Sequence, residues 1–321
     1  MSSPDTGLLV YTKYADDIPR FRELLGQSLP DEAIAFATSA QEAAPHLAHA
    51  SVLYGWGFPS GMAQSMPRLR WIQKMGAGVE DLAGARWPFG SSVVLTRTDG
   101  RLIAPRMVEY VTWAVLRRTL GAETLHALSA ARRWNYVETG SIRQHTVGVA
   151  GLGEIGTEIA SALRSLGADV VGWRRTASAS AAVRRVYAGS EELAAFLSCC
   201  SILVLVLPTT SDTGGLIGHD ALYRLKRGAH LINVGRGGVI DDDALIAALD
   251  DGQLSHATLD VFATEPLPDQ HAFWTHPKVT MTPHVSGPLI PEDVVPHFVE
   301  NFQAFHAGRP MRNAVAPERK Y

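Results

Sequence analysis

The stretch Val147-Gly-Val-Ala-Gly-Leu-Gly-Glu-Ile-Gly156 joins a short apolar run to a glycine-rich turn. The run predicts a strand over residues 147–150, and the amphipathic segment 154–166 predicts a helix directly after the turn. In this strand–turn–helix context, Gly-x-Gly-x-x-Gly is typical of a loop that binds a dinucleotide pyrophosphate. Gly151 forms the turn, Gly153 lets the phosphates approach the backbone, and Gly156 lets the helix pack against the strand. The helix start, with Glu154 and Ile155, points its N–H groups at the phosphates.

Apolar runs alternate with helical segments on both sides of this turn. We expect strands at residues 8–11, 33–36, 52–54, 70–74 and 93–95, and again at 147–150, 170–173, 201–207, 230–234, 257–261 and 279–282. Two longer helices, over residues 101–120 and 122–133, separate the two series. This alternation of strands and helices predicts an α/β fold with two doubly wound, Rossmann-like parallel sheets and a cleft between their domains.

The positions of these elements suggest where the domains meet. We expect residues 1–98 and 288–321 to form a flavodoxin-like domain that binds the substrate. Residues 99–287 would form the Rossmann domain that binds the dinucleotide. A last helix, at about 291–307, would return the chain to the first domain.

Composition excludes several classes of protein. Of 321 residues, 46% are hydrophobic and 19% are charged, which is typical of a globular chain. The net charge of -3, without long basic runs, argues against a nucleic-acid partner. We find neither an apolar run long enough to span a membrane nor a secretory signal, and expect a cytoplasmic protein without a metal site. The adjacent Cys199 and Cys200 are expected to be reduced and buried, with a redox pair as the alternative.

The second strand of the dinucleotide unit indicates which cofactor is preferred. An NAD-binding unit usually has an acidic residue about 20 positions after the glycine turn, where it bonds the ribose hydroxyls. Here the run is Val170-Val-Gly-Trp-Arg-Arg-Thr176, with Arg174 at that position. Arginine suits a 2′-phosphate, so we expect Trp173, Arg174 and Arg175 at the cofactor, and NADPH to be preferred over NADH. The alternative is a solvated basic loop.

Three polar residues follow three successive strand-like runs after the turn: Arg236, Glu265 and His284. Because ligands bind beyond the carboxyl ends of such strands, we expect these side chains to converge beside the dinucleotide. A guanidinium binds a carboxylate, and an imidazole donates a proton. A carboxylate beside the imidazole favours its charged form and fixes the ring. Any one alone has an ordinary structural explanation, but together they suit reduction of a 2-oxo acid.

At this point a resemblance to a known family is evident. From about Trp71 onward the chain resembles the D-isomer-specific 2-hydroxyacid dehydrogenases. The resemblance rests on the glycine turn and on Leu207-Pro-Thr-Thr-Ser-Asp-Thr-Gly214, Asn233-Val-Gly-Arg-Gly237, Leu259-Asp-Val-Phe-Ala-Thr-Glu-Pro-Leu-Pro268 and Pro283-His284. Within that family, Leu69-Arg-Trp-Ile-Gln-Lys-Met-Gly-Ala-Gly-Val79, Trp173-Arg-Arg and Met281-Thr-Pro-His284 are most similar to the glyoxylate/hydroxypyruvate reductase branch.

The resemblance implies roles for particular residues. Arg236 would bind the substrate, Glu265 would be the partner of His284, and His284 would be the acid/base. Further cofactor contacts are implied at Leu207, Pro208, Thr213, Val234, Gly235, Arg236, Asp260, His284, Ser286 and Gly287, with Asp260 at the nicotinamide amide. Substrate contacts are implied at Gly76, Ala77, Gly78, Arg236 and His284.

Aromatic residues outside these motifs suggest two more features. Tyr54, Trp56 and Phe58 follow a strand of the first domain and are expected to wall the substrate pocket, with Trp56 in contact. Ordinary packing beneath a loop is the alternative. The helices of residues 101–133 form a dimer interface in similar proteins, so we expect a homodimer. A contact of Trp134 with the partner's pocket is the less favoured interpretation of that residue.

Together these features predict NAD(P)H-dependent reduction of small 2-oxo acids, such as glyoxylate and hydroxypyruvate, to D-2-hydroxy acids. Two alternatives remain open. One is another dehydrogenase of the family, of the D-lactate or D-3-phosphoglycerate type. The other is a non-catalytic, corepressor-like protein that senses NAD(P)H, because fold alone does not establish catalysis.

Overall fold

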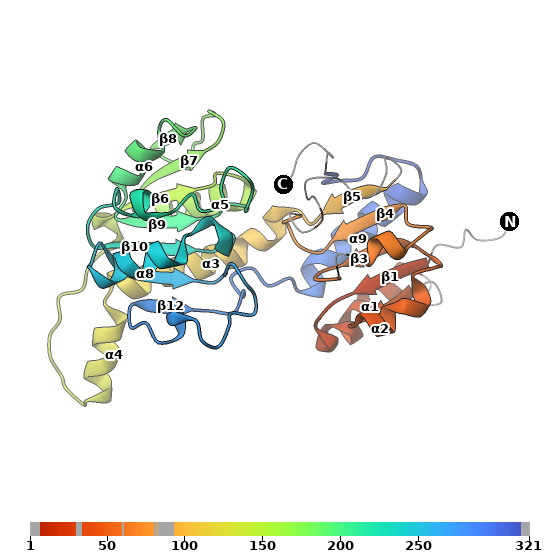
Figure 1. Cartoon of the computed structure of the whole chain (residues 1–321), viewed down its shortest axis with the longest axis horizontal. Coiled ribbons are helices and arrows are strands. Elements are labelled where there is room, and N and C mark those ends of the chain that lie inside the picture. Colours follow the sequence, from red (N-terminus) through yellow and green to blue (C-terminus); the bar gives the residue numbers. More distant parts are fainter. Residues whose placement is uncertain (1–6, 30–33, 60, 80–81, 83–92, 316–321) are drawn as a thin grey trace. The chain divides into compact units, whose positions relative to one another are not determined.

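A computed structural model describes residues 7–29, 34–59, 61–79, 82 and 93–315. The chain divides into two compact units (Figure 1). Unit 1 contains Met1–Leu102 and Leu289–Tyr321, and unit 2 contains Ile103–Pro288. Each is built on a parallel sheet with helices, which confirms the predicted α/β class.

Unit 1 holds a five-stranded sheet in the order β2-β1-β3-β4-β5. The strands are β1 (Gly7–Tyr11), β2 (Ile34–Ala37), β3 (Ala50–Gly55), β4 (Trp71–Lys74) and β5 (Val94–Arg97). The order is that of flavodoxin-like sheets. The second strand begins one residue after the predicted start, and Ala33 lies outside the described residues.

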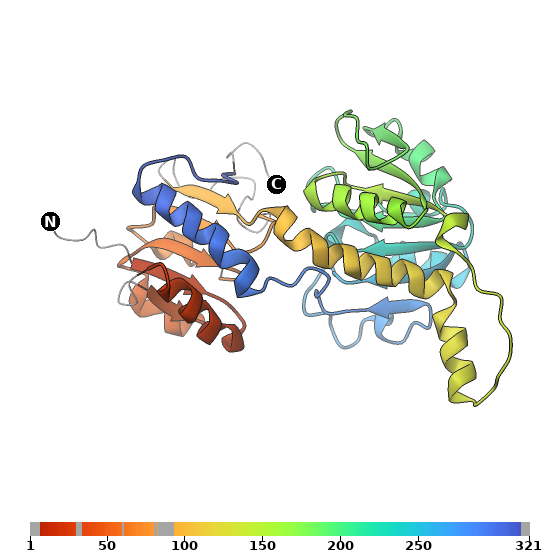
Figure 2. The same cartoon turned by 180° about the vertical axis from the view of Figure 1, so that it is seen from behind.

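Both faces of this sheet are covered by apolar side chains. Helices α1 (Ile18–Gly26) and α9 (Pro291–His306) lie side by side over one face (Figure 2). Phe298 of α9 stacks on Tyr54 at 4.1 Å and on Trp71 at 5.2 Å between ring centroids. Tyr54 lies within β3 and is fully buried, so its expected place in a pocket wall is wrong. The short helix α2 (Ala40–Ala43) follows β2.

Unit 2 holds a seven-stranded sheet in the order β12-β11-β10-β9-β6-β7-β8. Its strands are β6 (Thr146–Ala150), β7 (Asp169–Arg174), β8 (Arg185–Ala188), β9 (Ile202–Leu205), β10 (Ala229–Asn233), β11 (Leu254–Leu259) and β12 (Val279–Met281). The strand order reverses between β6 and β9, and this switch point is where open α/β sheets bind their ligands. The glycine turn begins directly after β6.

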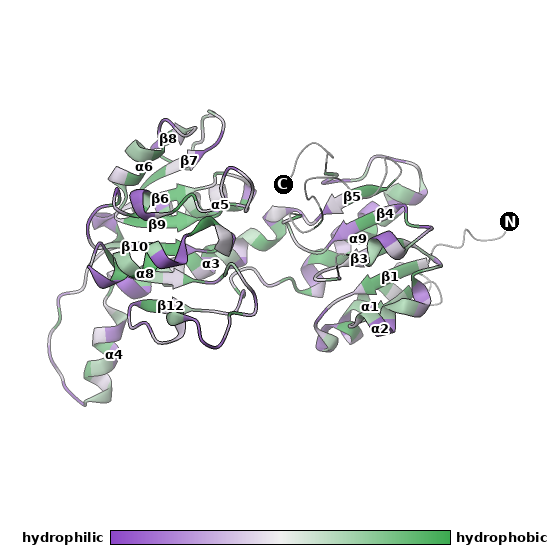
Figure 3. Ribbon diagram, in the orientation of Figure 1, coloured by the Kyte–Doolittle hydropathy of each residue, from purple (hydrophilic) through white to green (hydrophobic). Residues whose placement is uncertain are grey.

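Helix α3 (Gly100–Thr119) begins at the end of unit 1 and continues into unit 2. The other helices of unit 2 are α4 (Ala122–Ala130), α5 (Glu154–Ser165), α6 (Leu193–Cys199), α7 (His219–Leu222) and α8 (Asp242–Asp250). Helices α3 and α5 lie over one face of the sheet, and α8 lies over the other (Figures 1 and 2). The strands of both sheets are coloured largely hydrophobic in Figure 3. Gly121, with φ of +68°, turns the chain between α3 and α4.

Three details of unit 2 differ from the expectations. β8 and α7 were not predicted, because each has only four residues and charged or polar positions interrupt its apolar pattern. The predicted strand over 201–207 is shorter, since the chain leaves the ladder after Leu205. Cys199 is half-buried and Cys200 fully buried, both as free thiols. Burial raises the pKa of Cys200 to about 12, which makes that thiol unreactive.

Helix α4 differs from the other long helices. All of its residues are described and none is buried. In Figures 1 and 2 it projects from the body of unit 2 together with the long connection that follows it. Within the described ranges, we find no helix long and apolar enough to cross a lipid bilayer.

Candidate active site

The glycine turn has the close contacts that its sequence requires. Gly151 has a φ of +104°, and a Cβ there would lie 2.4 Å from the carbonyl oxygen of Val206. A Cβ on Gly156 would lie 1.9 Å from the Gly151 oxygen, so α5 packs directly on the turn. Gly153 is different, because a Cβ there would meet no described heavy atom within 4 Å.

This open space lies at the start of α5. Gly153 is the N-cap residue, and among the described residues no side chain caps this helix end. Glu154 and Ile155 belong to the first turn, where the positive end of the helix dipole and the outward-facing N–H groups favour an anion. An open, glycine-lined helix start therefore fits the pyrophosphate of a dinucleotide.

The end of β7 carries the residues predicted to select the cofactor. Trp173 is buried, and its indole Nε1 donates to the Gly189 oxygen at 2.8 Å. Arg174 ends the strand and Arg175 follows it, exposed. Nearby arginines are engaged elsewhere, because Arg184 pairs with Asp169 at 2.6 Å and Arg185 pairs with Glu192 at 3.1 Å. No carboxylate of the described residues pairs with Arg174.

The loop after β9 is closed by its own threonines. The Thr213 hydroxyl donates to the Pro208 oxygen at 2.6 Å and accepts from the Thr210 N–H at 2.8 Å. Leu207 is buried in the core below the loop. Pro208 and Thr213, predicted as cofactor contacts, therefore lie together at the carboxyl end of β9, beside the switch point.

The turn that carries Arg236 is held by the buried Asn233 at the end of β10. The Asn233 side-chain amide accepts from the Gly235 N–H at 3.1 Å and donates to the Arg236 oxygen at 3.1 Å. Gly237 presses against the next turn, because a Cβ there would lie 1.9 Å from the carbonyl carbon of Phe262. Val234 and Gly235 form the start of this turn, and a Cβ on Gly235 would lie 2.6 Å from the backbone nitrogen and oxygen of Leu207.

Glu265 and His284 meet in the structure. His284 Nδ1 lies 2.8 Å from Glu265 Oε2, while Glu265 Oε1 accepts the Phe262 N–H at 3.0 Å. Burial raises the pKa of Glu265, but the hydrogen bonds from His284 and Phe262, together with the charge of Arg236, lower it overall. The carboxylate is therefore ionised beside the imidazole. Both side chains remain about one-third exposed, at 34% for His284 and 37% for Glu265.

Asp260 lies at the end of β11 and is fully buried. Its carboxylate accepts from the backbone N–H groups of Val285 and Ser286, at 2.8 and 2.9 Å, and from the Thr282 hydroxyl at 2.6 Å. The described hydrogen-bond donors to this carboxylate thus belong to the segment around His284. Gly287, which follows this segment, packs on Met107 of α3.

The predicted substrate residues of unit 1 lie after β3 and β4. The Trp56 indole covers Gly76, since a Cβ on Gly76 would lie 3.5 Å from its Cδ1 and Nε1 atoms. The Ala77 oxygen accepts from the Arg97 guanidinium at 3.2 Å, which shapes the loop that also contains Gly78. Phe58 is buried in edge contact with Tyr11, so of the three predicted aromatics only Trp56 borders the loop.

Comparison with known proteins agrees with this geometry. The sequence model of the D-isomer specific 2-hydroxyacid dehydrogenase NAD-binding domain matches residues 112–286. The chain belongs to the D-isomer-specific 2-hydroxyacid dehydrogenase family. Glyoxylate/hydroxypyruvate reductase A of Serratia proteamaculans is 34% identical over 258 residues, which cover 79% of this chain and 82% of the relative. The predicted resemblance to that branch of the family is confirmed.

Two solved structures are similar over nearly the whole chain. The first is a D-isomer specific 2-hydroxyacid dehydrogenase from Xanthobacter autotrophicus Py2, in complex with NADPH and MES. It has 34% identity and a TM-score of 0.87, with 98% of this chain and 100% of that chain covered. The second is the NADPH-dependent glyoxylate/hydroxypyruvate reductase of Sinorhizobium meliloti, in complex with NADP and sulfate. It has 27% identity and a TM-score of 0.88, with the same coverage.

Family membership establishes the general chemistry of this dehydrogenase. It is an oxidoreductase that acts on the CH–OH group of its donor and binds a pyridine nucleotide. Sequence reasoning missed some residues of the site, namely Asn233, Tyr110 and Thr282. The Tyr110 hydroxyl of α3 lies 2.5 Å from the Thr282 hydroxyl, 172 positions away in the sequence, and no local pattern announces such a pair.

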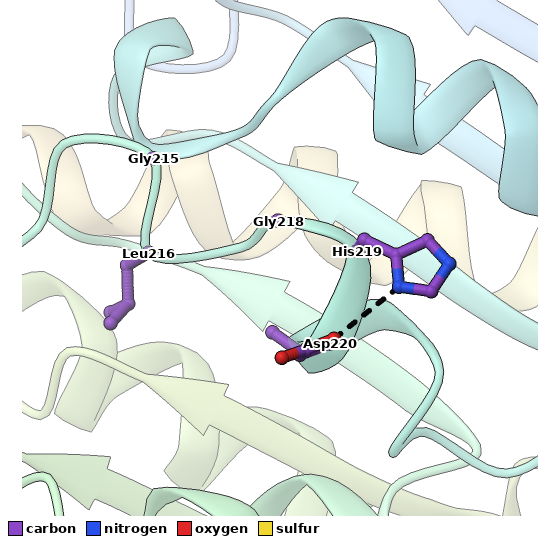
Figure 4. A pocket seen from close by; sticks show the side chains of 6 residues that line it. Gly215, Leu216, Gly218, His219 and Asp220 are labelled. Atoms are coloured by element: carbon purple, nitrogen blue, oxygen red, sulfur yellow. Dashed lines mark hydrogen bonds and ion pairs between the residues drawn. The ribbon is translucent and has the colours of Figure 1, made fainter.

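A hollow of about 380 Å³ beside α7 is not this site. It is lined by Gly215, Leu216, Gly218, His219, Asp220 and Ala221 (Figure 4). His219 Nδ1 lies 3.4 Å from Asp220 Oδ1, and both side chains are exposed. Because none of the three predicted catalytic residues lines it, the hollow does not bear on the assignment.

Proposed function

We propose that this dehydrogenase reduces small 2-oxo acids, glyoxylate and hydroxypyruvate, to D-2-hydroxy acids with NADPH as its preferred cofactor. The observation that carries the proposal is the His284–Glu265 pair at 2.8 Å, with the charge of Arg236 acting on Glu265. The three residues follow β12, β11 and β10, which belong to the sheet that carries the glycine turn. Relatives named glyoxylate/hydroxypyruvate reductase support the substrate class.

In this proposal each residue of the chain has a distinct task. Arg236 binds the substrate carboxylate and polarises the carbonyl. The backbone N–H groups of Gly76, Ala77 and Gly78 bind the carboxylate as well, beside the Trp56 indole. Because Nδ1 of His284 is engaged with Glu265, Nε2 is the atom that donates a proton to the carbonyl oxygen. The reduced nicotinamide, when bound, supplies the hydride to C2 of the substrate.

The preference for NADPH rests on the end of β7. A guanidinium binds phosphate with paired, charge-assisted hydrogen bonds, whereas an acidic residue there would repel the 2′-phosphate. Arg174 stands where that acidic residue is usual, while Arg184 and Arg185 are paired with carboxylates. Both similar structures contain NADPH or NADP, as their descriptions state.

We also propose that the enzyme acts as a homodimer through the helices of residues 101–133. One hollow on the surface of unit 2 is lined by apolar side chains of α3, α4 and the turn between them, namely Trp113, Leu116, Leu120, Ala122 and Leu125, together with Arg117, Glu123 and His126. Beyond α4, Trp134 and Tyr136 are almost fully exposed, at 102% and 93%. Contiguous exposed apolar surface of this kind marks an interaction site. Light scattering after size exclusion should give twice the chain mass, and a single-chain mass would overturn the dimer.

Oxidation of reduced nicotinamide tests the proposed reaction directly. Glyoxylate, hydroxypyruvate, pyruvate and phenylpyruvate are each supplied with NADPH and with NADH, and the absorbance of the reduced cofactor is followed. We expect the fastest turnover with NADPH and the first two acids. Turnover mainly with bulky acids, or mainly with NADH, would refute the substrate or the cofactor assignment. Cofactor binding without turnover of any acid would favour the alternative of a non-catalytic protein that senses NAD(P)H.

Two substitutions separate the proposed roles. His284→Ala should lower kcat by about 1,000-fold or more, while NADPH still binds, because the proton donor is lost. Arg236→Ala should mainly raise KM for the oxo acid, with a smaller fall in kcat. Near-normal turnover of the His284 variant would remove this residue from the mechanism.

A further inference from the structure

His284 has an unusual backbone conformation. Its φ is 55°, in the left-handed region that residues with a Cβ rarely adopt. Such a conformation persists only where surrounding contacts hold it, and it is common at functional sites. The structure must therefore contain groups that fix the chain on both sides of His284.

Asp260 supplies most of these contacts. Its backbone oxygen accepts the His284 N–H at 2.9 Å. Its carboxylate accepts the next two N–H groups, those of Val285 and Ser286, at 2.8 and 2.9 Å. One buried residue thus binds three consecutive N–H groups, which fixes the direction in which the His284 side chain leaves the backbone.

Thr282 and Tyr110 extend this arrangement to α3. The Thr282 hydroxyl donates its only hydrogen to Asp260 Oδ1 at 2.6 Å, so the Tyr110 hydroxyl at 2.5 Å must be the donor to Thr282. Burial, together with the charge of Asp260, raises the pKa of Tyr110 to about 12. The phenol is therefore neutral and keeps its proton, and the chain of donors runs from Tyr110 through Thr282 to Asp260.

We propose that Tyr110 and Thr282 are positioning residues for the reaction, acting through Asp260 on the backbone of His284. Their hydrogen bonds keep the Asp260 carboxylate oriented toward the N–H groups of Val285 and Ser286. The imidazole is thereby held where Nδ1 meets Glu265. This inference rests on the proposed role of His284 as proton donor. It adds Tyr110 of α3 and Thr282, which directly follows β12.

The geometry predicts a defect in turnover rather than in binding. A displacement of a catalytic group by about 1 Å can cost about 100-fold in rate. Thr282→Val removes the hydroxyl while keeping the shape, so we expect kcat to fall at least about tenfold, with KM and NADPH affinity within about twofold of wild type. Thr282→Ser retains the hydroxyl and should restore most of the rate.

Tyr110→Phe is the second variant, chosen because it deletes one oxygen and leaves the packing of α3 intact. We expect a smaller fall in kcat, and the double variant with Thr282→Val should be no slower than Thr282→Val alone, since both act through one chain of hydrogen bonds.

The outcomes distinguish this inference from the proposed function. If His284→Ala turns over normally, the proposed function fails first. If His284→Ala is inactive but Thr282→Val and Tyr110→Phe retain the wild-type kcat, the positioning role is wrong. If both variants lose NADPH affinity as steeply as kcat, the hydrogen bonds of Tyr110 and Thr282 serve cofactor binding instead, and the inference is also overturned.

Discussion

The buried histidines of unit 2 should make this enzyme acid-labile. His256 of β11 is 6% exposed, and its Nε2 lies 2.8 Å from the Thr280 hydroxyl. His230 of β10 is buried beside it, with 5.5 Å between ring centroids. Burial, with Arg118 nearby, lowers the pKa of His256 to about 4. Burial and the neighbouring His256 also lower the pKa of His230.

The sign and size of the effect follow from these values. In the unfolded chain His256 binds a proton below pH 6.5, whereas in the folded chain it stays neutral down to about pH 4. Protons therefore favour the unfolded state throughout this window, and stability falls as the pH is lowered. From 6.5 to about 4, at about 1.36 kcal/mol per pH unit, the loss is about 3 kcal/mol. About 2 kcal/mol of it should be lost by pH 5.

Urea unfolding followed by circular dichroism at pH 7.5 and pH 5 measures this loss. His256→Gln removes the titrating ring but keeps an amide that can bond Thr280, so this variant should lose about 2 kcal/mol less than wild type between the two pH values. With a typical urea dependence, that difference moves the midpoint by about 1 M. His219→Gln, at an exposed position on α7, is the matched control and should behave as wild type. Equal losses for wild type and His256→Gln would refute the reasoning.

Three further predictions concern the site. Arg174→Asp should reduce the NADPH/NADH ratio of kcat/KM by about 30-fold or more, since charge-assisted hydrogen bonds are worth about 1.5–3 kcal/mol each. Arg185→Ala is the control. An unchanged ratio in Arg174→Asp would refute the assignment of Arg174 to the 2′-phosphate. Glu265→Gln removes the carboxylate that holds Nδ1 of His284, so kcat should fall by about tenfold or more while NADPH still binds, and wild-type turnover would count against the pairing. Gly153→Ala should keep the wild-type unfolding temperature but bind NADPH more weakly in fluorescence titrations, whereas Gly156→Ala should lose about 1–3 kcal/mol of stability. Unimpaired NADPH binding by Gly153→Ala would contradict the role of the open turn.

Much of this arrangement could be predicted from sequence, because it depends on strand ends. Arg236, Glu265 and His284 each follow an apolar run, and parallel strands bring their carboxyl ends to one edge. The 2.8 Å contact between His284 and Glu265 is the geometry that their assigned roles require. The predicted glycine turn likewise has the close approaches at Gly151 and Gly156 that exclude any side chain.

Other features depend on distant contacts that leave no local pattern. Tyr54 follows the apolar alternation of β3, yet only the fold shows that it stacks on Phe298 of the last helix. The Tyr110–Thr282 bond joins residues 172 positions apart. Asp260 illustrates a third limit, because no local pattern shows that its carboxylate accepts three protein donors from the segment around His284.

Buried contacts explain how two loops hold the proposed catalytic side chains in place. Asn233 and Asp260 are fully buried at the ends of β10 and β11, and the Asp260 N–H donates to the Asn233 oxygen at 3.0 Å. Asn233 fixes the turn of Arg236, and Asp260 fixes the turn of His284. The relative placement of guanidinium and imidazole therefore derives from the register of two neighbouring strands rather than from the loops themselves.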